Sequence, residues 1–152
     1  FIECFPRFAG DVLLKPSYDL RSLSWLFERL AQEKRFGTFQ KILVRNAENE
    51  ILGWYLYNLK PGGRSEVLQI AATQQSVQQV LDHLFRHAWE HGSIELSGRM
   101  VPKFMKAFAD KWCLFSPGRN WMLIHSRDPK IVQTIYCGDA FLSRLEEDLW
   151  FF

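Results

Sequence analysis

The sequence predicts an α/β (α+β) protein with a mixed, largely antiparallel sheet that carries helices on both faces. Residues 39–72 contain three β-type runs separated by two turns, "NAENE" and "KPGGRS", which predicts three successive antiparallel strands. After this meander, helical and strand-like periods alternate, which predicts further strands and the helices that cover the sheet. With 152 residues, 47% of them hydrophobic, the chain is long enough for a single domain, residues 1–152, with a substantial core.

The first third of the chain predicts one strand-like segment, one helix and the start of the meander. Residues 11–15, "DVLLK", are a short apolar run that stops at Pro16, and we interpret them as a first strand or an interdomain connection. A helix is predicted from Asp19 to just before Gly37, because apolar residues recur there at three- and four-residue steps. The middle strand of the meander, Ile51–Leu59, is the most apolar, so we expect it to be covered on both faces.

The remaining elements alternate between helix and strand. A helix is predicted from about Ser76 to His91, followed by a short strand over 93–98. The next predicted helix, 101–112, has Pro102 near its start and buries Phe104, Met105 and Phe108. A strand is predicted over 120–126. Two short helices complete the chain; the first is capped by Asp128, and Gly138 separates them.

Composition excludes several classes of partner. The 19 basic and 17 acidic residues leave a net charge of +2, and no basic run is interleaved with aromatics, so we expect no nucleic-acid partner. No apolar run approaches the roughly 20 residues that span a bilayer, and no signal peptide is recognisable, so we expect a cytoplasmic protein without a membrane partner. The odd set of three cysteines, without a C-x-x-C pair, indicates neither a disulfide framework nor a zinc site.

Both ends of the sequence are apolar, "FIECFPRF" and "LWFF". Side chains of this kind need a surface to pack on. We therefore expect residues 1–10 to connect to a missing N-terminal part of a larger protein, or the ends to dock on a homodimer partner.

The order of elements resembles that of the GNAT acetyltransferase superfamily. The specific similarity lies in "EILGWYLYNLKPGGRSEVLQIAATQQSVQQVLDHLFRHAWEHG", a strand with a Gly-aromatic start, a hairpin turn, a strand and a helix. The tail, residues 128–150, is similar to the C-terminal end of bacterial GNAT-like proteins, including those with two such domains in tandem. The resemblance covers about residues 11–150 in the order of elements. It implies transfer of an acyl group from acetyl-CoA or another acyl-CoA to a small-molecule or peptide amine.

The resemblance also implies a cofactor site between the strand 66–72 and the strand 93–98. The candidate residues lie at the end of the first strand and at the following helix start: Ile70, Ala71, Ala72, Gln74, Gln75, Ser76, Val77 and Gln78. The family's loop, Arg/Gln-x-x-Gly-x-Gly/Ala, uses glycines so that a pyrophosphate can approach the free N–H groups of a helix start. Here the glycines are absent, and Ser76 with Gln79 has the form of a capping box that would occupy those N–H groups. The alternative is therefore a non-catalytic GNAT-fold binding or interaction module that has lost CoA binding.

For the chemistry, the resemblance implies a general base and a general acid, for which Glu66 and Tyr136 are the candidates. The competing interpretations are a strand-end charge in water for Glu66 and an amphipathic core residue with its hydroxyl at the surface for Tyr136. His83, His87 and His91 follow at four-residue steps on one helix, so His83 and His87 are a candidate metal pair. We favour a solvated helix face and expect no native metal.

Overall fold

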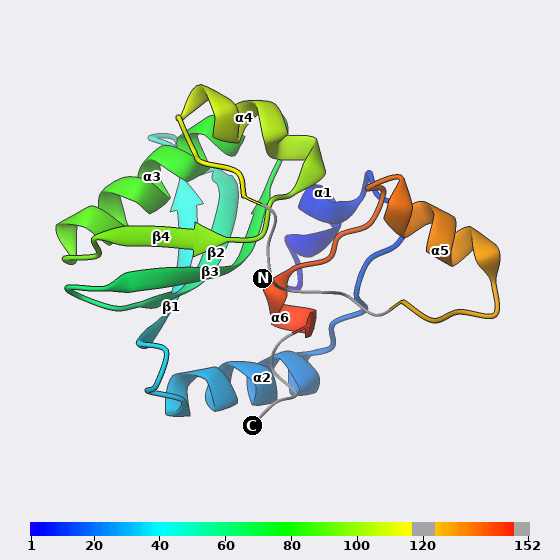
Figure 1. Ribbon diagram of the computed structural model, residues 1–152, viewed down its shortest axis with the longest axis horizontal. Helices are drawn as coiled ribbons and strands as arrows, with labels where there is room; N and C mark the ends of the chain where they lie inside the picture. The colour runs from blue at the N-terminus through cyan, green and yellow to red at the C-terminus, as the bar shows by residue number, and fades with distance from the viewer. Residues whose placement is uncertain (117–123, 148–152) are drawn as a thin grey trace.

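The computed structural model describes residues 1–116 and 124–147, with side chains up to residue 145. Its centre is a four-stranded sheet in the order β1 (Thr38–Arg45), β2 (Ile51–Leu59), β3 (Arg64–Ala72) and β4 (Glu95–Gly98). The first three strands are antiparallel neighbours, and β4 runs parallel to β3 (Figure 1). The mixed, largely antiparallel sheet predicted from the sequence is confirmed.

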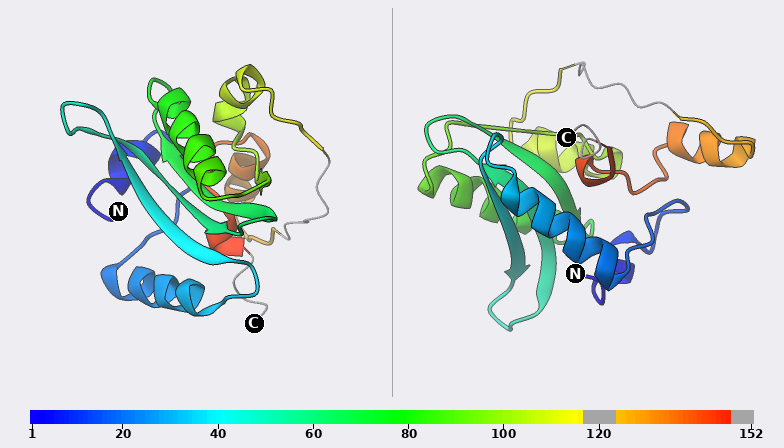
Figure 2. Two further views of the ribbon diagram at one scale, coloured as in Figure 1. Left: turned by 90° about the vertical axis from the view of Figure 1, so that its left-hand side faces the viewer. Right: turned by 90° about the horizontal axis from the view of Figure 1, so that it is seen from below.

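Helices cover both faces of this sheet, as predicted (Figure 2). One face packs against α3 (Val77–Glu90) and α4 (Met105–Asp110), which follows the 3₁₀ turn η1 (Pro102–Phe104). The other face packs against α1 (Phe5–Ala9), α2 (Leu20–Gln32) and α6 (Arg144–Glu147). The remaining helix, α5 (Pro129–Tyr136), lies to one side of the sheet (Figure 1).

Strand β2 is the centre of both hydrophobic cores. Successive side chains of a strand point to opposite faces, so Trp54 and Leu56 enter the core under α1, α2 and α6. Tyr55 and Tyr57 enter the core under α3 and α4. Every residue from Gly53 to Leu59 is buried, which confirms the expectation for the middle strand.

The helix starts and stops read from the sequence are largely confirmed. Asp19 caps α2 because its Oδ1 accepts from the Ser22 N–H at 2.7 Å, and Asp128 caps α5 by accepting from the Lys130 N–H at 2.9 Å. Gly138 ends the helical stretch of α5 with φ = +73°, a left-handed conformation that favours glycine.

Three predictions about elements need correction or fall outside the described part. Residues 11–15 form no strand of the sheet; Leu14 alone makes an isolated parallel bridge, to Ala140, because the chain pairs there with its own C-terminal part. Met105 is 49% exposed because the buried face is formed by Phe104, Ala107 and Phe108, at steps of three and four residues, and Met105 lies one residue off it. Most of the strand predicted over 120–126 lies outside the described residues, and the described part, 124–126, is not a strand.

Candidate functional site

Strands β3 and β4 diverge where the GNAT resemblance predicts a cofactor. They pair over four residue pairs, from Arg64↔Glu95 to Val67↔Gly98, after which the chain leaves β4 for η1 while β3 continues to Ala72. At the same level the ladder between β2 and β3 shifts register, with Leu68 as the extra residue of a bulge. The second half of β3 therefore has an edge that β4 does not cover.

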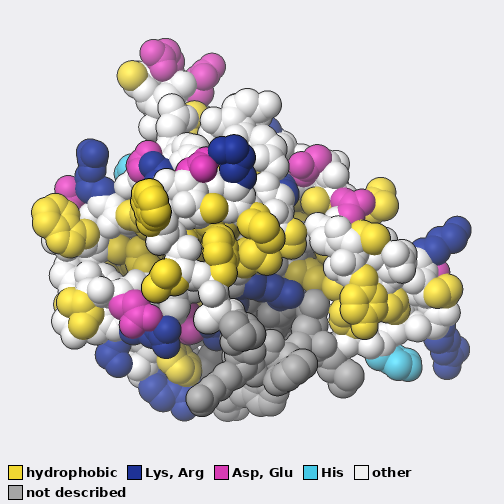
Figure 3. Space-filling view, turned by 45° about the horizontal axis from the view of Figure 1, so that its top comes forward, with side chains coloured by type: hydrophobic (Ala, Val, Ile, Leu, Met, Phe, Trp, Pro, Cys, Tyr) yellow, Lys and Arg dark blue, Asp and Glu magenta, His cyan; other side chains and the backbone are white. Residues whose placement is uncertain are grey.

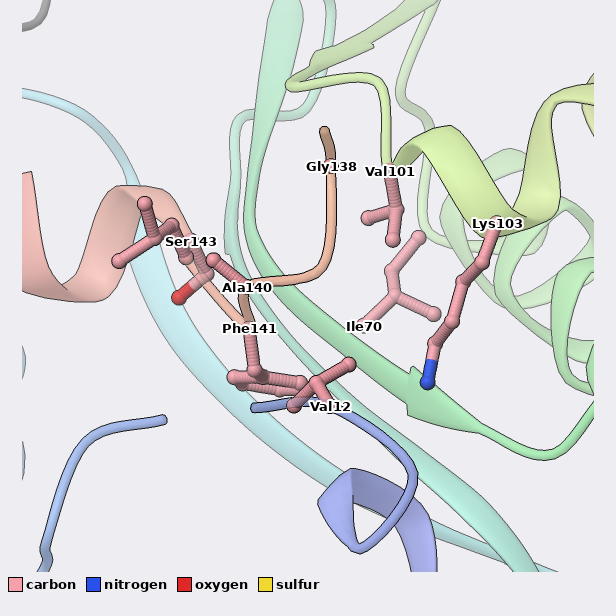
Figure 4. Close-up of a pocket in the computed structure, with 9 residues that line it drawn as sticks. Val12, Ile70, Val101, Lys103, Gly138, Ala140, Phe141 and Ser143 are labelled. Atoms are coloured by element: carbon pink, nitrogen blue, oxygen red, sulfur yellow. The ribbon is translucent and has the colours of Figure 1, made fainter. Parts of the chain in front are cut away.

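That edge is covered by the C-terminal part of the chain itself. Ala140, Phe141, Leu142 and Ser143 line the space beside Ile70, together with Val12, Val101 and Lys103 (Figure 4). The cavity that remains has a volume of about 20 Å³. This is enough for about one water molecule and too little for the arm of a coenzyme.

The predicted cofactor residues at the end of β3 are separated by the sheet. Ile70 lines the small cavity. Ala71 is fully buried in the core under α1 and α2, whereas Ala72 is buried in the core under α3. Val77 is 2% exposed and packs in that second core as well. Of these four residues, Ile70 alone borders the space where a cofactor was expected.

The junction between β3 and α3 closes on itself, but through different residues from those predicted. The Thr73 N–H donates to Ser76 Oγ at 3.0 Å, and the Ser76 N–H donates to Thr73 Oγ1 at 3.2 Å, which is a reciprocal capping arrangement. The Ser76–Gln79 box is wrong: Ser76 has helical dihedrals and makes no cap bond from its side chain. Its hydroxyl instead donates to the Leu52 carbonyl at 2.6 Å. The reciprocal bonds of Thr73 with Ser76 place the cap one turn earlier.

The polar side chains near this junction are engaged by η1 and α4. Gln74 Nε2 donates to the Lys103 carbonyl at 2.7 Å, and Gln78 Nε2 donates to Asp110 Oδ2 at 3.4 Å. The Lys103 ammonium, a cation beside the cavity, contacts the Phe8 carbonyl at 3.2 Å and Asp11 Oδ1 at 3.3 Å. Gln75 is exposed. Gln74 and Gln78 thus connect the junction to η1 and α4, whereas Gln75 remains exposed.

The two candidate catalytic residues are not brought together. Glu66 pairs with Arg144 of α6, and their side chains are 27% and 17% exposed. The interpretation of Glu66 as a strand-end charge in water is therefore wrong, since its carboxylate is held in an ion pair. Tyr136 lies on α5 with 78% of its surface exposed, to one side of the sheet (Figure 1).

A buried polar network next to this ion pair was not predicted. Gln69 is 3% exposed; its Oε1 accepts from Trp54 Nε1 at 2.9 Å, and its Nε2 donates to Tyr18 Oη at 3.0 Å and Ser143 Oγ at 3.2 Å. The signal in the sequence is the single glutamine within "VLQIAA", because a buried amide in an apolar strand requires partners.

His83 and His87 of α3, and His91 directly after it, form a second polar cluster with two tyrosines of β2. Tyr55 Oη lies 2.9 Å from His83 Nδ1, and Tyr57 Oη lies 2.7 Å from His87 Nδ1. His91 Nδ1 lies 2.7 Å from the His87 carbonyl, and its ring stacks on that of His87 with 4.2 Å between centroids. Across the described part of the chain, no group of three or more His, Cys, Asp or Glu is placed to hold a metal.

Burial shifts the pKa values of Tyr55, Tyr57 and His87 in this cluster. Burial raises the pKa of Tyr57 to about 12, and burial together with Tyr57 raises the pKa of Tyr55. Both hydroxyls therefore stay protonated at neutral pH, each beside a histidine ring nitrogen. Burial, followed by the charges of His91 and His83, lowers the pKa of His87. The Nδ1 atoms of the candidate metal pair are thus occupied by tyrosine hydroxyls.

Comparisons with known proteins bear on the fold alone. No protein-family model matches the chain, and no curated protein matches it. Solved structures of the Thermus thermophilus protein TTHA1254 are similar: the wild type is 15% identical and a point variant 16% identical, each with a TM-score of 0.52. Each match covers 84% of this chain and 95% of the other. Within residues 1–116 and 124–147, no helix is long and apolar enough to cross a membrane.

Proposed function

We propose that this chain is a GNAT-like domain that acts as a non-catalytic binding or interaction module. The observation that carries the proposal is that Ala140, Phe141 and Leu142 line the space beside Ile70 of β3 and leave a cavity of only about 20 Å³. A cofactor that lay along β3 in the manner of the family would have to displace these residues.

Two further contacts support the same proposal. The Thr73 and Ser76 N–H groups, at the helix start where a pyrophosphate would bind, are taken by side-chain hydroxyls of the same turn. Glu66, the candidate base, pairs with Arg144, whereas a general base must lie within hydrogen-bond reach of the substrate proton. The N–H groups of Thr73 and Ser76 and the candidate base are thus engaged by the chain itself, whereas the candidate acid, Tyr136, is exposed.

Exposed apolar side chains provide a surface on which a partner could bind. Large apolar side chains are exposed at several positions of the described chain, among them Trp89, Ile94, Trp112 and Leu114, which are 76%, 77%, 89% and 98% exposed. Figure 3 shows hydrophobic side chains gathered across one face between charged residues. Gatherings of this kind are typical of protein or ligand contact.

A CoA-dependent acyltransferase is the second candidate, with acetyl-CoA or another acyl-CoA as donor and a small-molecule or peptide amine as acceptor. It is favoured by one observation, the divergence of β3 and β4 after Val67 and Gly98 beside the bulge at Leu68. For this candidate, acyl-CoA binding requires that residues 140–143 move away from β3.

Calorimetry and thermal melting with acetyl-CoA separate the two candidates. We expect no binding heat and an unchanged melting temperature at 1 mM acetyl-CoA. A working site with a dissociation constant of about 10 µM would instead stabilise the protein by about 2.7 kcal/mol at that concentration. For a chain of this length the melting temperature would then rise by about 5–11 °C.

Sodium pyrophosphate at matched ionic strength is the control for non-specific anion binding. A rise with acetyl-CoA that pyrophosphate does not reproduce would refute the non-catalytic proposal and support the acyltransferase.

A further inference from the structure

The segment that follows α4 holds large apolar side chains out toward the solvent. We call residues 112–115 the apolar loop. Trp112 is 89% exposed, Leu114 is 98% exposed and Phe115 is 51% exposed. Cys113, between the first two, is partly buried and packs against the core under α3 and α4. The loop is therefore anchored at Cys113 and presents the side chains before and after it to the outside.

The backbone of the apolar loop is fixed at the end of α4 in a strained conformation. The Trp112 N–H donates to the Ala109 carbonyl at 2.9 Å, and the Cys113 N–H donates to the Phe108 carbonyl at 3.1 Å. Trp112 has φ = +57°, a left-handed conformation that bulky residues disfavour and that glycine usually adopts at a helix end. Because so little of Trp112 is buried, packing does not offset this strain. Strained residues are typical of functional sites, and here the group presented is the indole.

Basic residues are concentrated in the same stretch of chain. Residues 99–116 contain four basic residues and one acidic residue, a net charge of +3, whereas the whole chain carries +2. The three lysines each pair with one aspartate: Lys103 with Asp11, Lys106 with Asp110, and Lys111 with Asp82. Lys106 is the most exposed of them, at 88% of its side chain, and a pair at such exposure is weak because water screens it. An anionic surface can therefore attract these cations.

The exposed apolar surface continues onto α3. Gln78 Nε2 donates to Asp110 Oδ2 at 3.4 Å. Asp82 pairs with Lys111, so Gln78 and Asp82 mark the side of α3 that faces α4. Trp89 follows Asp82 by two helical turns and therefore lies on the same side, with 76% of its surface exposed. Figure 3 brings the top of Figure 1, where α4 lies, toward the viewer and shows hydrophobic side chains gathered there with Lys and Arg side chains beside them.

These features favour a lipid surface over a protein partner. Side chains as exposed as Trp112 and Leu114 project from the protein instead of forming the wall of a groove. A bilayer receives projecting side chains without a matching shape, with Trp at the level of the headgroups and Leu below it. Lys and Arg are attracted to anionic headgroups. The expectation of no membrane partner rested on spanning segments and signal peptides, which a surface contact does not require.

We propose that the apolar loop is a peripheral membrane anchor. Trp112 and Leu114 enter the interfacial region of an anionic bilayer, and Lys106 with its basic neighbours contacts the headgroups. The inference rests on the proposed function, a non-catalytic binding module, and names an anionic lipid surface as its partner.

Sedimentation of the full chain with lipid vesicles tests this proposal. We expect binding to phosphatidylcholine vesicles that contain one third phosphatidylserine, and weaker binding to pure phosphatidylcholine or at high salt. Leu114→Ser should lower the affinity for the anionic vesicles by about tenfold, because serine has no apolar side chain to bury. Lys106→Gln should lower the same affinity by about fivefold and leave binding to pure phosphatidylcholine unchanged.

Trp112→Gly separates binding from folding. It should lower the vesicle affinity by about tenfold, yet leave the melting temperature unchanged or higher, because glycine adopts φ = +57° without strain. Leu20→Ser and Lys34→Gln are the matched controls. Leu20 is 74% exposed on α2, which packs on the opposite face of the sheet, and Lys34 is exposed just after that helix. Both controls should bind vesicles as the wild type does.

Several results would overturn the proposal. They are the absence of vesicle binding, binding that Leu114→Ser and Trp112→Gly leave unchanged, an equal loss in the control variants, and a lower melting temperature of Trp112→Gly. A dimer that forms without vesicles and dissociates in Leu114→Ser would assign the loop to a second copy of the chain and overturn it as well. Because the vesicle experiment uses no acetyl-CoA and the acetyl-CoA experiment uses no vesicles, failure of either proposal is recognised independently.

Discussion

The hydrogen bond between Tyr57 of β2 and His87 of α3 gives a direct test of how α3 is held on the sheet. Tyr57→Phe removes the hydroxyl that lies 2.7 Å from His87 Nδ1 and leaves the ring, which is fully buried, in place. The net contribution of one such bond is about 0.5–1.5 kcal/mol. His87 is only partly buried, so water can reach the freed nitrogen and spare the full desolvation penalty.

We therefore expect Tyr57→Phe to lower the free energy of unfolding by about 1 kcal/mol, and the melting temperature by about 2–4 °C for a chain of this length. Tyr136→Phe is the control, because Tyr136 is 78% exposed and its change should cost less than about 0.5 kcal/mol. Chemical denaturation of Tyr57→Phe, His87→Ala and the double variant should give a coupling energy of about 1 kcal/mol. A coupling near zero, or equal effects at Tyr57 and Tyr136, would refute the fastening of α3 by this pair.

Two further predictions concern α3 and its start. Because the pKa of His87 is lowered in the folded state, the unfolded chain binds more protons, so the free energy of unfolding should fall as the pH drops below about 6.5. His87→Gln should reduce this loss in thermal melts at a series of pH values, and an unaltered pH profile would contradict the prediction. Thr73→Ala should lower the free energy of unfolding by about 1 kcal/mol, because it removes the cap at the β3–α3 junction, while Thr73→Ser should retain most of the stability. Equal stability of the two variants in urea would show that the Thr73 hydroxyl does not cap the helix.

Local patterns predicted most of the secondary structure because the groups that decide it are close in sequence. Asp19 and Asp128 cap helices through N–H groups two or three residues away, and Gly138 ends a helical stretch through its own φ. The meander followed from alternation and from turn residues. The junction at Thr73–Ser76 was located correctly, but its cap was assigned to the wrong pair, because the Leu52 carbonyl on another strand engages the Ser76 hydroxyl.

The candidate site was predicted less well because its contacts join distant parts of the chain. Four-residue spacing placed the histidine rings of α3 together, yet the spacing contains nothing about the tyrosines that approach from β2. Glu66 was recognised as a carboxylate near the expected cofactor, but its partner, Arg144, lies at the other end of the chain.

Between Asp19 and about residue 112, the sequence was enough to predict the order of the elements, the turns, most of the helix ends and the strand-to-helix junction. Short-range hydrogen bonds and hydrophobic period decide these features. The tertiary structure alone decided what fills the space beside β3. That outcome depends on the pairing of Leu14 with Ala140 and on the burial of Phe141 and Leu145, which involve residues from both ends of the chain. Contacts of this kind form only when the sheet brings the two ends together, so no local pattern encodes them.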